Sequence, residues 1–402
     1  MMTEKVYLEN PYLMKLNAKI LENKFKNNKF YVKLNRTIFY PNMSGGQLGD
    51  KGSIDGIEVL DVYEKNDDII HVLSDLPKNE IVELHINWDI RFKNMQQHTG
   101  QHIVSNAFSK LLDFETISFH MNKDFNYIDI KANFLNQNVI DKIESYSNRI
   151  VFSNFEIYCY IIDDKTISKI PLRETTKKET DIRIVEINKL DFCACGGTHH
   201  RRTGEVGLIK LINWYKIKDN YRVEFVCGVK ALEDYNLKNN IITKLKNDLS
   251  ISTNDTLEAI NKIKLELENF KKSNTILKTK LIDYKTIWLK NNSIKYKNIK
   301  IISDAVDEFD LNETIKIINH ITQYNNYVII IGINENDKSQ FVLAKSSNLN
   351  INIKNVFDKL LYSINGNGVR NKNIYQGGCK ESNKAQSIVT NGLNLIKEEV
   401  DR

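Results

Sequence analysis

The sequence has few cysteines, no long apolar run and little excess of either charge. Its five cysteines form an odd, widely spaced set in 402 residues, which excludes the disulfide framework of a small secreted protein and fits a reducing cytoplasm. No apolar run approaches the ~18 residues that cross a bilayer. The start, MMTEKVYLEN, has no basic stretch followed by an apolar one. We therefore expect a soluble, cytoplasmic protein with no membrane partner.

Length and charge set wide limits on the architecture. At about 100 to 200 residues per domain, this length predicts two to four domains. The 57 Lys and Arg residues against 51 Asp and Glu give a net charge of +6. This mild excess leaves a polyanionic partner open without indicating one.

The first half of the chain changes from strands to a mixed pattern. Residues 1–88 alternate β-rich runs with glycine-bearing turns, which predicts a small antiparallel barrel. Asp89 is a good N-cap for a helix. The apolar residues of that helix share one stripe, which should be buried: Val104, Phe108, Leu111 and Leu112. Strand-like runs and a helical stretch at 138–150 complete an α+β domain over 89–228.

Residues 229–291 have almost no glycine and no proline, which favours uninterrupted helix. SISTND separates two helices, and the second carries an apolar seam spaced by three and four residues. We call these residues the apolar seam of 256–291: Ile260, Ile263, Leu267, Phe270, Leu277, Leu281, Tyr284 and Trp288. Asn274 lies on the same seam, and a lone polar residue there can fix register. The pattern fits a helical hairpin that packs on itself and a homodimer through 256–291 equally well.

After residue 292 the pattern becomes α/β, with strands alternating with helices around 311–323, 353–363 and 381–398. A glycine-bearing loop, NGNGVRNKNIYQGGCK, precedes the last helix. The fold class is therefore α+β multidomain, with domains over 1–88, 89–228, 229–291 and 292–402.

Two short motifs supply metal-binding side chains. His98 and His102 stand at i and i+4 of the predicted helix, so both imidazoles lie on one face. Alone, that pair fits two surface histidines as well. Cys195 and His199 add a thiolate and an imidazole four residues apart, with two glycines between them. Together the motifs offer three nitrogens and one sulfur, which predicts one tetrahedral zinc ion per chain.

The same motifs argue against protease chemistry and against two neighbouring ligands. Thr99 stands where a zinc protease of the HExxH type has its general-base glutamate, so protease chemistry lacks its base. Cys193 and His200 are competing ligands, but the spacing favours Cys195 with His199.

These motifs resemble a known family. QQHTGQHIVS followed by CACGGTHHRRTGEVGLIK is similar to the editing domain of alanyl-tRNA synthetase and its free-standing AlaX relatives, and FYPNMSGGQLGDKG resembles their glycine-rich segment. The C-terminal helices and GNGVRNKNIYQGG resemble the DHHA1 domain of the long AlaX type. Asn367, Val369 and Asn371 depart from the family's glycine-richer loop, which puts its RNA contact in doubt. The likeness covers nearly the whole chain and leaves no room for an aminoacylation module.

The resemblance implies a deacylase that removes the wrong amino acid from tRNA(Ala) and does not charge it. Its substrate would be mischarged tRNA(Ala), as Ser-tRNA(Ala) or Gly-tRNA(Ala). Two alternatives stay open. One is a tRNA-binding module whose zinc is structural, since sites with four protein ligands usually are. The other is editing of Ser-tRNA(Thr), because the threonyl-tRNA synthetase editing domain resembles the same pattern.

Further residues are candidates for substrate contacts. Selecting serine over alanine needs a hydrogen-bond partner for the hydroxyl. Thr116, Ser118 and His120 alternate along one predicted strand and so share a face, which is equally typical of a solvated strand. Candidates for tRNA binding flank the motifs, although turn-forming glycines and solvated basic residues explain them as well: Gly45, Gly46, Gln47, Arg201, Arg202, Arg370 and Lys372. Lys380 adds to the basic rim, and Tyr375 could stack on a base.

Overall fold

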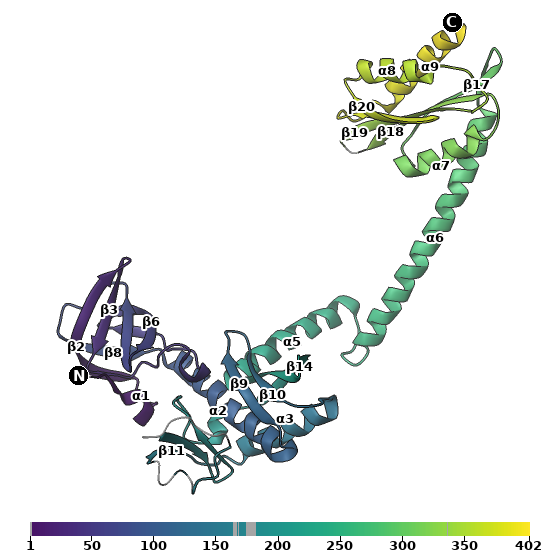
Figure 1. Cartoon of the computed structure of the whole chain (residues 1–402). Coiled ribbons are helices and arrows are strands. Elements are labelled where there is room, and N and C mark those ends of the chain that lie inside the picture. Colours follow the sequence, from purple (N-terminus) through teal and green to yellow (C-terminus); the bar gives the residue numbers. More distant parts are fainter. Residues whose placement is uncertain (1, 164–166, 168, 174–181, 336) are drawn as a thin grey trace. The chain divides into compact units, whose positions relative to one another are not determined.

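The computed structural model describes residues 2–163, 167, 169–173, 182–335 and 337–402. The chain divides into two compact units, Met1–Ser250 and Ile251–Arg402 (Figure 1). The structure thus divides the chain at one place, and the bounds of the four predicted domains stay predictions. Among the described residues, no helix is long and apolar enough to span a bilayer.

The first unit begins with a closed antiparallel barrel, as predicted for this segment. Its strands follow one another around the barrel in the order β2-β3-β7-β6-β5-β8. They are β2 (Lys15–Lys26), β3 (Lys29–Leu34), β5 (Gly52–Ile54), β6 (Ile57–Lys65), β7 (Asp68–Leu73) and β8 (Ile81–Ile86). Short elements flank them: β1 (Glu4–Lys5), α1 (Val6–Glu9), β4 (Arg36–Thr37) and the 3-10 turn η1 (Ser44–Gly46). Inward-facing Val, Leu and Ile side chains fill the interior.

The barrel interior also holds one histidine. His71 is fully buried, with Nε2 2.8 Å from Thr37 Oγ1 and Nδ1 3.3 Å from the Val32 carbonyl. Burial lowers the pKa of His71 to about 4. An unfolded histidine has a pKa of about 6.5. The neutral ring is therefore the form that the folded barrel accepts.

We expect acid to destabilise this unit through His71. As pH falls from about 6.5 to about 4, His71 becomes protonated in the unfolded chain but stays neutral in the folded chain. The free energy of unfolding therefore falls by up to about 3 kcal/mol. Urea unfolding of wild type and His71→Leu between pH 7 and pH 4.5 measures this, and the wild type should lose more stability. His320→Gln, which changes an exposed histidine of the second unit, is the control. Parallel pH profiles for wild type and His71→Leu would contradict the prediction.

The rest of the first unit is built around one central helix, α2 (Trp88–Leu112). It packs with α3 (Gln137–Phe152), a four-stranded sheet ordered β14-β15-β10-β9 and a three-stranded sheet ordered β11-β12-β13. The strands are β9 (Glu115–Met121), β10 (Asn126–Lys131), β11 (Ile157–Ile162), β12 (Ile182–Ile187), β13 (Asp191–Ala194), β14 (Ile209–Ile217) and β15 (Asn220–Cys227), with the 3-10 turn η2 (Thr203–Val206).

Two details of α2 differ from the prediction. The cap is Asn87, whose side chain accepts from Ile90 N at 3.2 Å, and Asp89 lies in the first turn. Leu111 is 43% exposed, whereas Leu112 packs against the core, so Leu111 does not belong to the buried stripe. Between residues 94 and 108 the helix is buried on every side, its polar faces included. A helix enclosed in this way can hold polar groups away from water, where their interactions are stronger.

The two helices predicted over 229–291 are present as α5 (Gly228–Leu249) and α6 (Thr256–Asn291). They belong to different units, so the predicted hairpin stays a prediction. Every residue of the apolar seam of 256–291 is exposed in the described chain.

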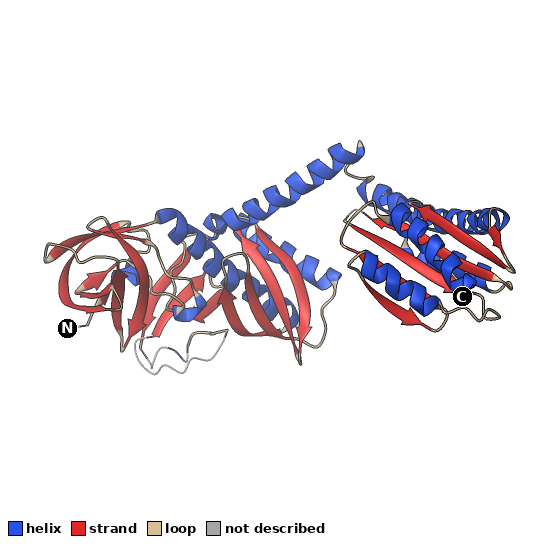
Figure 2. Ribbon diagram, turned by 90° about the horizontal axis from the view of Figure 1, so that it is seen from above, coloured by secondary structure: helices blue, strands red, loops and turns tan. Residues whose placement is uncertain are grey.

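The second unit carries a six-stranded sheet with helices on both faces (Figures 1 and 2). The strand order is β16-β17-β18-β19-β21-β20, and only β17 and β18 pair in parallel. Helices α6 and α7 cover one face, while α8 and α9 cover the other. The elements are β16 (Ile294–Tyr296), β17 (Ile299–Val306), α7 (Leu311–Thr322), β18 (Tyr327–Glu335), β19 (Lys338–Lys345), α8 (Ile353–Ser363), β20 (Asn367–Asn371), β21 (Ile374–Cys379) and α9 (Ala385–Asp401).

The prediction of a loop before the last helix is wrong. Residues 367–379 form the hairpin β20–β21 at the edge of the sheet. Its glycines hid the strand pattern. A Cβ on Gly377 would lie 2.7 Å from the Phe341 ring, and one on Gly368 would lie 2.5 Å from the Phe357 ring. These strands use glycine because aromatic rings pack directly against their backbone.

Candidate metal centre

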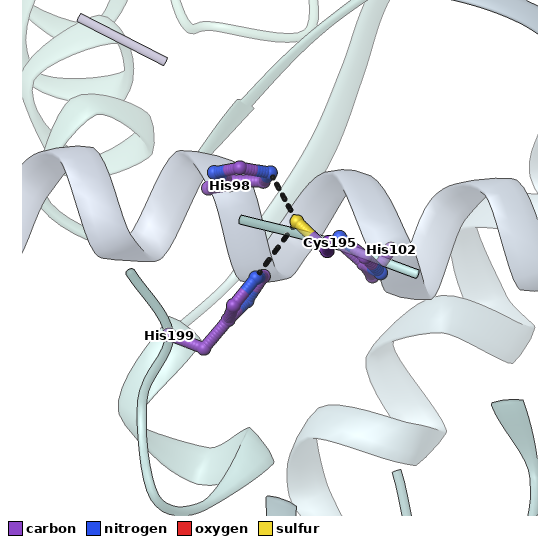
Figure 3. Close-up of side chains that lie close together, drawn as sticks. All are labelled: His98, His102, Cys195 and His199. Carbon is purple, nitrogen blue, oxygen red and sulfur yellow. Dashed lines mark hydrogen bonds between the residues drawn. The ribbon is translucent and has the colours of Figure 1, made fainter. Parts of the chain in front are cut away.

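The four side chains predicted as metal ligands lie together inside the first unit (Figure 3). Helix α2 carries His98 and His102 one turn apart, and the segment after β13 carries Cys195 and His199. Their ligand atoms all lie within 4.8 Å of one another. Cys195 Sγ is 3.4 Å from Nε2 of His98 and 3.4 Å from Nε2 of His199. Each imidazole is only 2% exposed.

The donor set and its spacing fit a tetrahedral zinc ion. Zinc bonds of about 2.0–2.3 Å put neighbouring ligand atoms about 3.3–3.8 Å apart, close to the separations around Cys195. Burial raises the pKa of the Cys195 thiol, but the three imidazoles lower that pKa well below its usual value, which favours the thiolate, the form that binds metal. Burial lowers the pKa of His102, but the sulfurs of Cys193 and Cys195 and the Asp191 carboxyl raise it well above its usual value. A metal ion bound here would compete with a proton for the His102 ring.

Outer hydrogen bonds orient the ligands, beginning with Gln47. Its side chain is fully buried, and Oε1 accepts from His98 Nδ1 at 2.7 Å and from Thr198 N at 3.1 Å. Its Nε2 donates to Thr198 Oγ1 at 2.8 Å. With Nδ1 of His98 occupied, Nε2 is free to bind metal. Gln47 thus joins the glycine-rich segment of the barrel to both ligand motifs.

His199 has a hydrogen-bond partner on its outer side, whereas His102 has only a carboxylate oxygen nearby, beyond hydrogen-bond distance. Thr99 Oγ1 lies 3.2 Å from His199 Nδ1, and Asp191 Oδ2 lies 3.8 Å from His102 Nδ1. Each arrangement leaves Nε2 turned toward the cluster. The sequence motifs did not reveal Gln47, Thr99 or Asp191 in these roles, because their partners are distant in the chain.

The two glycines of the second motif allow it to pass close to the first. A Cβ on Gly197 would lie 2.0 Å from Cε1 of His98, so no other residue fits there without moving that imidazole. The Gly197 amide also donates to Cys195 Sγ at 3.3 Å. This backbone hydrogen bond further stabilises the thiolate.

We expect Gln47→Met to weaken metal binding by about 10- to 100-fold, the usual effect of removing an outer partner of a metal-bound histidine. Methionine keeps most of the volume but cannot accept from His98 Nδ1. Metal retention against graded concentrations of a competing chelator measures the effect. Gln137→Met, at the exposed start of α3, is the matched control. An unchanged chelator midpoint for Gln47→Met would contradict the role.

A cavity of about 940 Å³ opens beside the cluster, and Cys195 and Gly196 form part of its wall. The N-terminal segment contributes Lys5 and Glu9, and strand β12 contributes Arg183. Its volume lies in the range of about 300–1,000 Å³ that is usual for ligand pockets. The backbone around the thiolate ligand is therefore reachable from an open space.

The prediction that Thr116, Ser118 and His120 share one face of β9 is wrong. In the register with β10, Thr116 pairs with Ile130 and Ser118 pairs with the next residue, so Ile117 forms a bulge. A bulge adds one residue to one strand and reverses the alternation of its side chains. No residue pattern in the sequence marks this bulge.

The bulge separates the three side chains. Thr116 faces α2, where its hydroxyl donates to Ser105 Oγ at 2.8 Å. Ser118 faces the other way and donates to Asp129 Oδ2 at 2.9 Å. The exposed His120 stacks on Tyr127 with centroids 5.0 Å apart. Phe119, between them, turns its ring toward the cluster, 5.5 Å from the ring of His98.

The glycines predicted to approach RNA lie in η1, against strand β9. A Cβ on Gly46 would be 2.8 Å from the Phe119 carbonyl oxygen, and Gly46 has φ of +77°. Gly45 also has positive φ, at +56°. Contact with β9 therefore explains Gly46, and the buried Gln47 side chain has its polar atoms fully engaged within the protein.

The two arginines after the second motif lie on the surface with protein partners. The Arg201 guanidinium lies 4.3 Å from the centre of the Tyr12 ring. Arg202 pairs with Glu156 at 2.8 Å and donates to the Asn154 carbonyl at 3.1 Å. Both remain accessible to a phosphate.

Arg370 and Lys372 lie in the β20–β21 hairpin of the second unit, and both are exposed. Arg370 forms an ion pair with Asp358 and lies over the Phe357 ring. Lys372 occupies the turn with φ of +37°.

The two competing ligands lie outside the cluster of four. Cys193 lies in β13 and is 9% exposed. His200 is buried with Nδ1 3.2 Å from the Tyr12 hydroxyl and 3.7 Å from Glu205 Oε2. Tyr12 and Glu205 thus hold the chain that follows the last ligand.

Comparison with known proteins points to the editing of alanyl-tRNA. Residues 182–224 match the sequence family described as "Threonyl and Alanyl tRNA synthetase second additional domain". The alanyl-tRNA editing protein AlaX-L of Pyrococcus horikoshii is 31% identical over 94% of both chains. The alanine–tRNA ligase of Methanococcus maripaludis is 28% identical over 96% of this chain but only 42% of the ligase. The solved C-Ala domain of Aquifex aeolicus alanyl-tRNA synthetase matches 28% of this chain at 20% identity with a TM-score of 0.24, too weak to define a fold.

The domain match places the region around Cys195 and His199 in a class shared by threonyl- and alanyl-tRNA synthetases. The chain belongs to the family of alanyl-tRNA editing proteins of the AlaX-L type. The resemblance inferred from the motifs is thereby confirmed.

Proposed function

We propose that this chain is a trans-editing hydrolase that deacylates mischarged tRNA(Ala), with Ser-tRNA(Ala) and Gly-tRNA(Ala) as substrates. The observation that supports it is the buried group of three imidazoles and one thiolate beside an open cavity, in a member of the alanyl-tRNA editing family. The bond to be cleaved is the ester between the amino acid and the terminal ribose. The trans action is proposed from the likeness to AlaX-L, which extends over 94% of both chains, whereas the chain spans 42% of the Methanococcus maripaludis alanine–tRNA ligase.

We propose one zinc ion per chain, held by His98, His102, Cys195 and His199. When bound, the ion would polarise the ester carbonyl or lower the pKa of a water molecule. The protein's own task is to orient the ligands through their outer partners and to hold the ester in a buried, low-dielectric space. Hydrogen bonds and charges count for more in such a space than in water.

The geometry also bears on which amino acid is removed. The Phe119 ring stands beside His98 and favours a small side chain. Of the three residues predicted to contact a serine hydroxyl, only Thr116 faces α2, where Ser105 joins it to Gln101 through hydrogen bonds of 2.8 and 2.9 Å. We propose Thr116 as the remaining candidate for that contact. Ser118 and His120 face away from the helix that carries the ligands.

Hydrolysis assays with the purified chain test the function. Ser-tRNA(Ala), Gly-tRNA(Ala), Ala-tRNA(Ala) and Ser-tRNA(Thr) would be incubated separately, with metal content measured on the same sample. We expect the first two to be cleared and the last two to persist. Clearance of Ser-tRNA(Thr) alone would show that the substrate is mischarged tRNA(Thr). The description of the matched domain family also names the threonyl-tRNA synthetase.

The second candidate function is a tRNA-binding module with structural zinc. Four protein ligands favour it, because closed zinc sites are usually structural. Tight tRNA binding without turnover of any ester, in a sample with one zinc per chain, would establish it over the hydrolase.

Other parts of the proposal concern the partner and the assembly. We propose that the second unit is DHHA1-like and that exposed basic residues contact tRNA phosphates: Arg201, Arg202, Arg370 and Lys372. We propose Gly45 as a further contact. The exposed apolar seam of 256–291 is proposed to form a cytoplasmic homodimer, and a monomer mass in sedimentation equilibrium would contradict it.

A further inference from the structure

Arg183, in the central strand β12, lies at the boundary between the metal ligands and the cavity. Its Nη1 donates to the carbonyl oxygens of Cys195 at 2.8 Å and Gly197 at 3.0 Å. Its Nη2 lies 3.3 Å from the Leu8 carbonyl oxygen. The guanidinium thus holds the backbone of the second ligand motif while it lines the cavity.

The charge of Arg183 is not neutralised by these contacts. All three acceptors are neutral carbonyl groups, and within the described parts of the chain no carboxylate forms an ion pair with it. The second cation of the cavity wall differs, because Lys5 pairs with Glu64 at 2.5 Å. A half-buried guanidinium held by dipoles alone has donors and charge available for an anion.

The form of the cavity points to the kind of anion. Apolar side chains of Leu8, Ile161 and Ile182 line it together with the Tyr160 ring, so it offers a wall for a flat base as well as a cation. A tRNA ester presents a base, a ribose and, on the 5′ side of that ribose, one phosphate. A planar fork of N–H donors matches the oxygens of a phosphate.

We propose that the cavity receives the terminal nucleotide of the aminoacyl-tRNA and that Arg183 binds the phosphate on the 5′ side of that nucleotide. This deepens the proposed function and rests on it. Arg183 is a positioning residue: it fixes the ribose relative to the cluster and takes no part in bond cleavage. The same guanidinium donates hydrogen bonds to the carbonyls of Cys195 and Gly197. One side chain would therefore bind the phosphate and also position the backbone that carries the metal ligands.

Three serine esters distinguish the proposed phosphate contact of Arg183 from its hydrogen bonds to the ligand motif. They are a seryl minihelix, seryl-adenosine 5′-monophosphate esterified on the ribose, and seryl-adenosine without phosphate. For Arg183→Gln we expect kcat/KM to fall about 10- to 100-fold more on the first two substrates than on the third, as one charge-assisted phosphate contact predicts; any loss on the third reports the placement of the ligand motif alone. On the minihelix, the slope of log(kcat/KM) against log salt should become shallower by about one.

Arg149→Gln is the matched control, since Arg149 is an exposed arginine on α3 that does not line the cavity. It should leave all three rates unchanged. An equal loss on all three esters by Arg183→Gln, with or without loss of metal, would overturn the proposal and leave Arg183 as a support of the ligand motif. A wild-type chain that cleaves none of the esters would instead refute the proposed function itself.

Discussion

Cys195→Ala is expected to lose both its zinc and its deacylase activity, the latter by about a thousandfold. A bound metal supplies several kcal/mol of transition-state stabilisation, and each 1.4 kcal/mol corresponds to a factor of ten. Cys195 is the only thiolate in the cluster and touches two of the three imidazoles at 3.4 Å. Metal analysis and single-turnover hydrolysis of Ser-tRNA(Ala) on the same sample measure both losses.

The neighbouring cysteine makes the test specific. Cys193→Ala removes a buried sulfur two residues away in β13, outside the cluster of four, and should keep its zinc. Loss of zinc from Cys193→Ala but not from Cys195→Ala would show that Cys193, and not Cys195, is the metal ligand. If Cys195→Ala loses its metal and stays folded by circular dichroism yet hydrolyses the ester at the wild-type rate, the metal has no part in the reaction.

Arg91→Met is expected to lower the free energy of unfolding of the first unit by about 3–5 kcal/mol. Arg91 and Asp50 are both buried, and Nε of Arg91 donates to Asp50 Oδ1 at 2.9 Å. The other donors of the guanidinium reach the carbonyl oxygens of Pro11 at 2.7 Å and Ile38 at 2.5 Å. Without Arg91 the Asp50 carboxylate is buried with no compensating charge, and that is the large cost.

The effect should reach the metal centre, because Arg91 lies on α2 and its partners lie in the barrel segment. Urea unfolding gives the stability, and chelator resistance at raised temperature shows whether the cluster opens earlier. Arg36→Met is the control: Arg36 makes one hydrogen bond, to the Asn17 carbonyl at 2.9 Å, so a loss below about 1 kcal/mol is expected. The double variant Arg91→Met with Asp50→Leu should lose less than the two single changes added together. Strict additivity would refute the ion pair as the cause.

Local sequence predicted the group of four candidate ligands well. The i, i+4 spacing of His98 and His102 needs only a helix, and the short reach from Cys195 to His199 needs only a flexible backbone between them. Both requirements are met within a few residues, so neither depends on the rest of the fold. The barrel and the strands of the second unit followed from side-chain alternation for the same reason.

Two wrong predictions concern features that are set by contacts with other elements of the fold. Thr116 and Ser118 alternate in sequence, but the bulge at Ile117 is set by pairing with β10 and turns them to opposite faces. The hairpin at 367–379 read as a loop because its glycines accommodate aromatic rings from β19 and α8.

The sequence by itself thus determined the donor set, the family and the alternation of strands and helices, because each depends on neighbours along the chain. Only the tertiary structure decided what surrounds the donors. Gln47 read as a residue of a substrate loop, and Arg183 as one position in a strand. Folding brings Gln47 to His98 and Arg183 to the Cys195 carbonyl. These roles depend on hydrogen bonds between groups far apart in the chain, and no local spacing encodes such a bond.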